Sequence, residues 1–539
     1  MKRFLLTILA AGMLGPAFAQ QVERTYVTTD RSWYAAGETV YLSAFCVDVS
    51  DGVRLSGMSA VAYWELTSAE GMAVSGKIAL QDGRGAGTLV LPQSLPTGNY
   101  RLSAYTALSQ REEGYDARRG SRIISVYNTL STARVADAVV VEKAPSSSKG
   151  LPHSAGLTAR MTPEGQISLT SEAPASLSVS VFRSEPLTLY ETATLGQILD
   201  TPASPLSREV VPEYDGEILT LRLTQADGRP LENLESREVF ISRPGHLEDI
   251  YSGQLQPDGS VRFYTGNFYG PGDLVVTLEK GAPAFKVEME SPYRSLAPGD
   301  IPNLVLDPSQ KEVIARLGAR MQVTSAFDAD TLYQRLPTRS MAFLSDKYIT
   351  YVLDDYTRFA TLREVFVEYL SDIRTRGRGE DLEMQVRTVR LQNGVSAFRD
   401  LPSLILVDGV PVFNHSLVYA MDPALIQRVE VFPYYCTFGR VMYSGVANFV
   451  TFKGDLGGIR FGDNVRILNF TGAGYPVAFT PSGDSRYPGQ RETLLWQPVL
   501  DIQPGETLLL PAMQADEGLV LQVEGLTSDG RPLYLRQEF

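Results

Sequence analysis

Histidine and cysteine often carry catalysis or bind transition metals, and this chain has few of either. Its three histidines are His153, His246 and His415. They lie in separate segments, with no pair four residues apart and no second ligand at metal-binding spacing, so we expect neither a structural zinc site nor a metalloprotease helix. Two cysteines, Cys46 and Cys436, are too few for a fold held together by disulfides. Pairing between them stays open, although buried free cysteines are common.

Other catalytic patterns are also missing from the sequence. It has no Gly-x-Ser-x-Gly nucleophile motif, and the run Gly83–Gly87 lacks the Lys-Ser/Thr of a phosphate loop, so we interpret it as a β turn. The pair Asp354-Asp355 could suggest a glycosidase, but a sequence with 62 acidic residues contains such pairs by chance. Asp328 and Asp330 match no twelve-residue calcium loop. We therefore predict a protein that is not an enzyme and uses no cofactor or metal.

Four residues are candidates for contact with a partner: Asp408, His415, Tyr434 and Tyr435. Asp408 follows an apolar strand, and His415 lies in the loop after the next short strand. Tyrosine is favoured at protein interfaces because it combines a large apolar face with a polar tip. Packing in a β core is the alternative interpretation of the tyrosine pair.

These residues belong to Leu401–Gly454, where turn and strand signals alternate. Asp408-Gly409 is a dipeptide that supplies positive φ in a tight hairpin turn. Asp422 and Pro423 have the residue types of a helix N-cap and first helical position. The predicted order is hairpin, short helix, strand, turn and strand, at Leu404–Phe413, Asp422-Pro423, Arg428–Phe432, Ser444-Gly445 and Ala447–Phe452.

This stretch resembles the plug domain of TonB-dependent outer-membrane receptors. The matching positions are Val407, Asp408, Gly409, Asp422, Pro423, Ile426, Val429, Glu430, Val431, Gly439, Gly445, Val450 and Thr451. The resemblance implies an α/β plug-like domain that docks to an outer-membrane protein. The chain after Gly454 is too short for the barrel that such receptors carry, so we expect no transport activity.

Near the N-terminus, β-rich runs separated by turns predict a β sandwich over 20–134. Two motifs there, at Asp30–Glu38 and Leu95–Tyr105, resemble the macroglobulin-type domain of exported bacterial proteins. We interpret their residues as structural: Tyr100, Leu102 and Ala104, for example, share one face of a strand by alternation. Neither cysteine precedes the Gly-Glu-Gln of the thioester in protease-trapping macroglobulins, so the resemblance does not imply that reaction.

The predicted fold class is mainly β, with several macroglobulin-like or immunoglobulin-like sandwiches and one α/β plug-like domain. Ser309 with Glu312, and Thr361 with Glu364, have the spacing of helix capping boxes in the plug-like domain. After the first sandwich we predict a linker and second β unit at 135–207, a sandwich similar to carboxypeptidase-regulatory-like modules at 208–295, the plug-like domain at 296–455 and a C-terminal β domain at 456–539.

Residues 1–19 have the pattern of a secretory signal peptide. Lys2-Arg3 is the positive region, Phe4–Leu14 is apolar, and Ala17-Phe18-Ala19 resembles a cleavage site. No later stretch reaches the roughly 18 apolar residues that a membrane helix needs. We expect an exported protein that is periplasmic or associated with the outer membrane, with no membrane-spanning segment after cleavage.

The net charge of −13 and the absence of a basic run disfavour nucleic acid and anionic lipid as partners. The sequence therefore predicts a non-enzymatic envelope protein with a binding or scaffold role, whose plug-like domain docks to an outer-membrane barrel or another envelope protein. The alternative is a periplasmic or surface protein that binds a glycan or peptide through sandwich loops. A hydrolase of unrecognised type is the third hypothesis, for which the sequence offers no candidate site.

Overall fold

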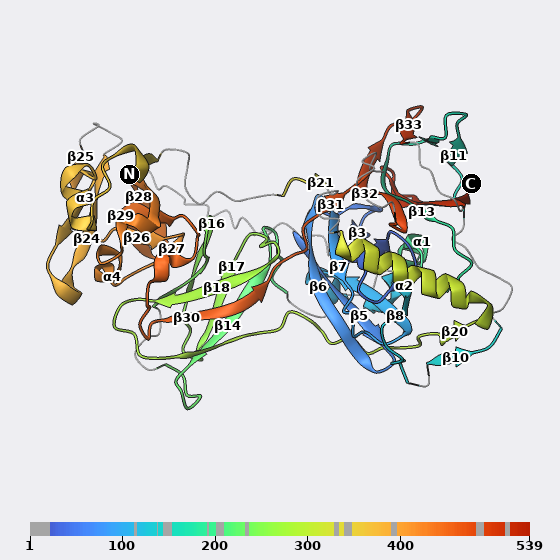
Figure 1. Ribbon diagram of the computed structural model, residues 1–539, viewed down its shortest axis with the longest axis horizontal. Helices are drawn as coiled ribbons and strands as arrows, with labels where there is room; N and C mark the ends of the chain where they lie inside the picture. The colour runs from blue at the N-terminus through green and yellow to red at the C-terminus, as the bar shows by residue number, and fades with distance from the viewer. Residues whose placement is uncertain are drawn as a thin grey trace, which may run out of the picture.

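The structure of the chain is a computed structural model (Figure 1). It describes residues 22–112, 116–136, 138–143, 153–190, 193–200, 210–231, 237–327, 334–338, 348–389, 396–480, 490–511 and 518–539. The predicted signal peptide, Asp328 and Asp330 lie outside the described residues, as does the side chain of His246. Strands predominate and form several sheets, so the chain is mainly β, as predicted. An α/β unit lies at one end, a sandwich in the middle and two more sandwiches at the other end (Figure 1).

The first sandwich is built from the nine N-terminal strands, in the order β1-β3-β7-β6-β5-β8-β9-β2, with β4 paired to β3. The strands are β1 (Glu23–Thr29), β2 (Trp33–Ala35), β3 (Thr39–Asp48), β4 (Arg54–Leu55), β5 (Val61–Ser68), β6 (Gly71–Gln81), β7 (Arg84–Val90), β8 (Gly98–Tyr105) and β9 (Arg122–Tyr127). Strand β6 pairs with β5 along most of its length and with β7 at its end, so it joins the two layers. Tyr100, Leu102 and Ala104 all lie in the core, which confirms their predicted common face.

The second sandwich combines two segments that are far apart in the sequence. Its sheets have the orders β11-β12-β33 and β32-β13-β34-β35. The strands are β11 (Leu157–Met161), β12 (Ile167–Ser171), β13 (Ala175–Arg183), β32 (Thr493–Ile502), β33 (Thr507–Leu510), β34 (Leu519–Thr527) and β35 (Pro532–Glu538). The sequence predicted these segments as separate units, at 135–207 and 456–539. The structure joins them because apolar residues of both segments fill one core.

The third sandwich forms in the predicted region but takes one strand from elsewhere. Its sheets have the orders β17-β14-β19 and β16-β15-β18-β30. The strands are β14 (Ile218–Thr224), β15 (Glu238–Arg243), β16 (His246–Gln254), β17 (Ser260–Tyr264), β18 (Pro271–Leu278), β19 (Lys286–Met289) and β30 (Val465–Thr471). Strand β30 follows the α/β unit in sequence, and its Phe470 packs in the core with its ring centroid 5.3 Å from that of Phe268. The α/β unit is therefore inserted into this sandwich.

The α/β unit has one sheet in the order β22-β28-β29-β26-β27 and a second in the order β23-β24-β25. Its elements are β22 (Ile349–Val352), α3 (Leu362–Glu368), β23 (Ile373–Arg376), β24 (Glu383–Val389), β25 (Ser396–Phe398), β26 (Leu404–Val407), β27 (Val410–Pro411), α4 (His415–Tyr419), β28 (Ile426–Phe438) and β29 (Val441–Thr451). Helix α3 begins with the predicted capping box of Thr361 and Glu364. Asp422 caps the short 3₁₀ turn Pro423–Leu425, near the predicted helix start.

The predicted turn at Ser444-Gly445 lies inside strand β29 in the structure. The two strands turn instead between Phe438 and Val441. Gly445 has a φ of +81° beside a shift in the register of β28 against β29, and a Cβ there would lie 2.6 Å from the Val386 side chain. This glycine therefore permits a β-bulge rather than a reversal of the chain.

Helix α2 (Lys311–Ala326) packs away from the α/β unit, against the first sandwich (Figure 1). Its Leu317 and Met321 share a buried cluster with Trp33. The plug-like domain was predicted to start at 296, but α2 belongs with the first sandwich, and the first strand of the α/β unit is β22. The predicted cap also differs, because Asp307 caps the preceding 3₁₀ turn and the residue before α2 makes no side-chain cap.

The remaining elements are short. They are β10 (Val139–Val141) paired with β20 (Leu304–Leu306), β21 (Gln334–Arg335) paired with β31 (Val477–Ala478), and helix α1 (Leu195–Leu199). In the part of the chain that the structure describes, no helix is both long and apolar enough to cross a membrane.

Candidate functional site

Asp408 is part of the predicted hairpin turn between β26 and β27, where it has a φ of +47° and Gly409 a φ of +81°. Its carboxylate accepts hydrogen bonds from the Thr451 amide and hydroxyl, both at 2.7 Å, and from the Leu456 amide at 2.9 Å. The residue is 2% exposed. Asp408 therefore ties the hairpin to the end of β29, and its carboxylate is not available to a partner.

Strands β28 and β29 extend beyond the residues that pair with β22 and β26, as a two-stranded ribbon formed by residues 433–444. One face of the ribbon packs on the third sandwich. The Phe438 ring lies 6.1 Å from the Phe240 ring between centroids, and the Arg440 amide donates to Glu238 Oε1 at 3.0 Å. We call this the inner face, and the opposite face the outer face.

Tyr434 and Tyr435 lie on opposite faces of the ribbon, because successive residues of a strand alternate. Tyr434 is half-buried on the inner face, with its ring centroid 5.2 Å from that of Phe432. Tyr435 is 40% exposed on the outer face. Met442, which pairs with Thr437, is 52% exposed on that same face. The structure thus leaves Tyr435, but not Tyr434, open to a partner.

His415 is the first residue of α4 and is half-buried, rather than lying in an open loop. Its Nδ1 accepts a hydrogen bond from the Met384 amide at 2.9 Å, so the proton of the neutral ring is on Nε2. Burial, aided by the positive charge of Lys280, lowers the pKa of His415 to about 4. At neutral pH the ring is therefore uncharged, and Nε2 can donate a hydrogen bond.

His415 lines a cavity of about 570 Å³ where the third sandwich meets the α/β unit, which we call the seam cavity. Leu401, Phe413 and Val441 give it apolar walls, with Leu401 40% exposed and the other two partly exposed. Asp381 and Glu383 contribute exposed carboxylates at its edge. A cavity of this size, with apolar walls and a few polar groups, has the usual form of a ligand site.

Tyr443, on the inner face of the ribbon, also lines the seam cavity. Its side chain is 4% exposed, yet its hydroxyl has no hydrogen-bond partner among the described residues. Burial raises the pKa of Tyr443, and the nearby Glu279 carboxylate raises it further, so the phenol stays protonated. The hydroxyl is not among the sealed polar atoms that lack a partner, and because Tyr443 lines the cavity a ligand there could form a hydrogen bond with it.

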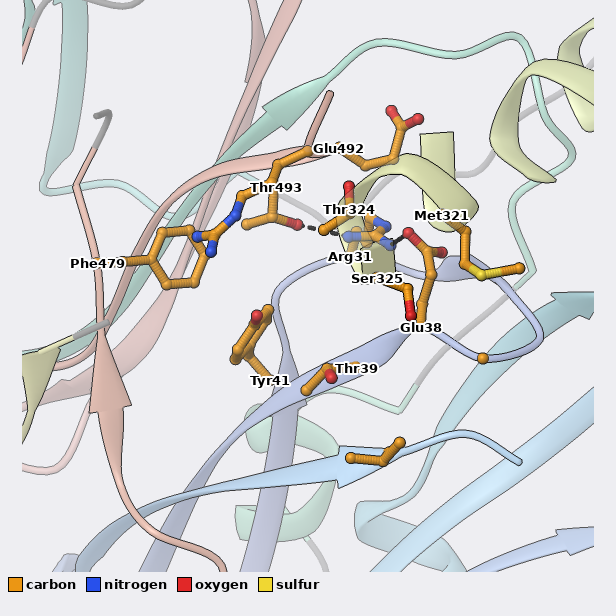
Figure 2. Close-up of a pocket in the computed structure, with 13 residues that line it drawn as sticks. Arg31, Glu38, Thr39, Tyr41, Met321, Thr324, Ser325, Phe479, Glu492 and Thr493 are labelled. Carbon is orange, nitrogen blue, oxygen red and sulfur yellow. Dashed lines mark hydrogen bonds and ion pairs between the residues drawn. The ribbon is translucent and has the colours of Figure 1, made fainter. Parts of the chain in front are cut away.

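A second pocket, of about 230 Å³, lies between the first sandwich, α2 and β32 (Figure 2). Arg31 donates to Glu38 at 2.8 Å and to Thr493 Oγ1 at 2.7 Å. Glu492 accepts from Arg320 of α2 at 3.1 Å. Burial raises the pKa values of the Glu38 and Glu492 carboxyls, and the Arg31 guanidinium opposes both shifts. The charged side chains of this pocket pair with one another and connect the first sandwich, α2 and β32. Because these groups already have partners, the pocket is a weaker ligand site than the seam cavity.

The first macroglobulin-type motif contributes to this same network. The Tyr34 hydroxyl donates to Asp30 Oδ1 at 2.7 Å, and Glu38 accepts from the Ala35 amide at 2.6 Å. The motif residues are therefore used within the fold, as the sequence analysis expected.

The described residues hold no group of three or more His, Cys, Asp or Glu side chains placed to bind a metal ion. Cys46 and Cys436 are free thiols, one in the core of the first sandwich and the other on the inner face of the ribbon. Burial raises the pKa of both thiols, that of Cys436 to about 11. The reactive thiolate is therefore disfavoured at either position.

Sequence reasoning found His415 but missed Tyr443 and the acidic edge of the seam cavity. These residues lie far apart in the sequence of the α/β unit, on the turn Gly379–Asp381, β24 and β29, and they meet only in the folded unit. The one available signal was the concentration of tyrosine in this part of the chain.

Comparison with known proteins found no matching protein-family model and no matching curated protein. Among solved structures, the chain is similar to trypsin-activated alpha-2-macroglobulin from Escherichia coli, with 11% identity and a TM-score of 0.22 over 97% of this chain and 41% of that one. It is also similar to Salmonella alpha-2-macroglobulin reacted with methylamine, with 11% identity and a TM-score of 0.16 over 96% of this chain and 23% of that one.

A third similar structure is the Escherichia coli adhesin FdeC, with 15% identity and a TM-score of 0.15 over 52% of this chain and 64% of that one. The chain spans less than half the length of either macroglobulin. Because these TM-scores are low, we base no assignment of fold or activity on them. The resemblance of Leu401–Gly454 to a receptor plug stays a prediction.

Proposed function

We propose that the chain is an exported, non-enzymatic binding and scaffold protein of a bacterial envelope, whose α/β unit docks to an outer-membrane protein. The observation that carries the proposal is the outer face of the ribbon, where Tyr435 and Met442 are both exposed. The inner face packs on the third sandwich and borders the seam cavity. An aromatic and a thioether side chain on an open strand pair are typical of a protein interface.

The position of this surface also supports docking. The α/β unit lies at one end of the molecule, and the first and second sandwiches lie at the other (Figure 1). The third sandwich connects the two ends. Its Glu217 accepts a hydrogen bond from Lys77 of the first sandwich, and its Phe240 packs with the ribbon of the α/β unit. The sandwiches then serve as a spacer that presents the ribbon to the partner.

The test is affinity purification of the tagged full chain from gently solubilised, cross-linked envelopes. We expect one outer-membrane protein to be recovered, and to be lost with the double variant Tyr435→Ser/Met442→Ser. The matched control is Met161→Ser/Leu509→Ser, which removes two exposed apolar side chains from the second sandwich. Equal recovery with the ribbon variant and the wild type would contradict the docking proposal.

The seam cavity favours a second candidate function, the binding of a peptide ligand. Its volume, apolar walls and unused polar groups suit an extended chain better than a flat protein surface. This site differs from the sandwich loops that the sequence analysis considered for ligand binding.

A further inference from the structure

We infer that the seam cavity binds a basic peptide segment, an extended stretch in which lysine or arginine neighbours an apolar side chain. The inference rests on the ligand-binding function proposed above and specifies its ligand. It does not involve the outer face of the ribbon, because Tyr443 in the cavity and Met442 on that face point to opposite sides of β29.

The charge at the edge of the cavity selects for a cation. Glu380, Asp381 and Glu383 line it, and none of the three takes part in an ion pair within the described residues. Lys280 is the only cation among the lining residues, and its Nζ donates to the backbone carbonyl of Glu380. A lysine or arginine of the ligand would meet several uncompensated carboxylates, whereas an acidic ligand would be repelled.

The interior of the cavity selects for an apolar neighbour of that cation. Leu401 is 40% exposed, Phe413 and Val441 are partly exposed, and all three line the cavity. An apolar side chain of the ligand that packs against them is transferred out of water. This transfer is the main favourable contribution in most protein association. A free inorganic cation or a simple sugar would not use these walls.

Two polar groups inside the cavity match a peptide backbone. His415 Nε2 carries a proton, and neither it nor the Tyr443 hydroxyl has a hydrogen-bond partner among the described residues. The imidazole N–H can donate to a peptide carbonyl, and the phenol can donate to a carbonyl or accept from an amide. A peptide in the cavity can thus form hydrogen bonds with both the His415 imidazole and the Tyr443 hydroxyl.

The experiment measures binding of two labelled peptides to the full mature chain by fluorescence anisotropy. One is the acetylated and amidated hexapeptide Gly-Leu-Lys-Leu-Lys-Gly, and the other has glutamate in place of both lysines. We expect the lysine peptide to bind at least tenfold more tightly, with an affinity that falls as salt is added. Equal affinity of the two peptides would overturn the basic specificity but leave ligand binding in place. Absence of binding by either peptide would overturn both.

Variants then locate the site. Asp381→Asn/Glu383→Gln changes two exposed side chains and should weaken binding of the lysine peptide about tenfold, whereas Tyr443→Phe removes only a hydroxyl and should weaken it about fivefold. The matched control Asp51→Asn/Glu164→Gln removes two exposed charges from the first and second sandwiches and should bind as the wild type does. Unchanged affinity of both cavity variants would place the peptide elsewhere and overturn the inference.

Discussion

At the scale of single residues, Glu213 is a buried acid with a hydrogen-bond partner for only one of its two carboxylate oxygens. Its Oε1 accepts from the Tyr63 hydroxyl at 2.7 Å and from the Ile218 amide at 3.0 Å, but Oε2 has no partner within the described residues. Burial raises the pKa of Glu213 to about 7, and Glu217 adds to the shift. The folded state therefore holds this proton more tightly than the unfolded state.

Because the pKa of Glu213 is higher in the folded state, its contribution to stability falls as the pH rises from about 4.5 to 7, by about 3 kcal/mol in all. Glu213→Gln keeps the side chain neutral, so we expect a smaller fall in the thermal midpoint between pH 5 and pH 8 than in the wild type. Glu164→Gln, at an exposed position, is the control and should leave the wild-type pH dependence unchanged. An identical pH dependence for Glu213→Gln and wild type would refute this account of Glu213.

At the scale of elements, a buried ion pair joins the first sandwich to the second. Arg122 of β9 donates to Glu524 of β34 at 2.6 Å, and both side chains are 1% exposed. Glu524 also accepts from the Tyr26 and Thr28 hydroxyls of β1 and from Gln522. These hydrogen bonds and the Arg122 charge together offset the cost of burying the Glu524 carboxylate. If Glu524 is removed, the Arg122 guanidinium is left buried without its partner charge.

We therefore expect Glu524→Ala to lower the free energy of unfolding by about 3–5 kcal/mol, as for other broken buried pairs. The control is Glu290→Ala, which breaks the exposed pair with Arg222 at 3.5 Å and should cost less than about 1 kcal/mol. Urea denaturation of the three proteins provides the comparison. Similar losses for the two variants would show that burial does not set the strength of the Arg122–Glu524 pair.

Local signals in the sequence predicted several elements well. The turn at Asp408-Gly409 and the capping box of Thr361 and Glu364 appear as expected, because each depends only on neighbours in the chain. The turn predicted at Ser444-Gly445 was wrong, since a glycine with positive φ serves a bulge as well as a turn. Its role depends on the close approach of Val386, which no local pattern reveals.

At the scale of the whole molecule, the chain is organised by insertion. The third sandwich and the α/β unit lie in sequence between the two segments of the second sandwich, and the α/β unit lies between β19 and β30 of the third. The sequence predicted β units in these regions but not which segments pair, because the pairing of distant segments is decided by a shared core. For the same reason, the seam cavity could not be predicted from sequence.

This organisation predicts that the two segments of the second sandwich hold together without the covalent connection. If a protease site is inserted within 481–489 and cut, we expect the C-terminal fragment to co-elute with the rest of the chain in native size-exclusion chromatography, because β32 and β34 both pair with β13. Addition of urea should separate the fragments. Separation under native conditions would contradict the pairing of the two segments.

The central claim is that the outer face of the ribbon contacts an outer-membrane protein. The most direct measurement is site-specific photo-cross-linking in intact cells, with a photoreactive residue at Tyr435 and, as a control, at Leu509, which is 56% exposed on the second sandwich. The account predicts one discrete cross-linked product at position 435, identified by mass spectrometry as an outer-membrane protein, and no such product at position 509. No product at position 435, or the same products at both positions, would contradict it.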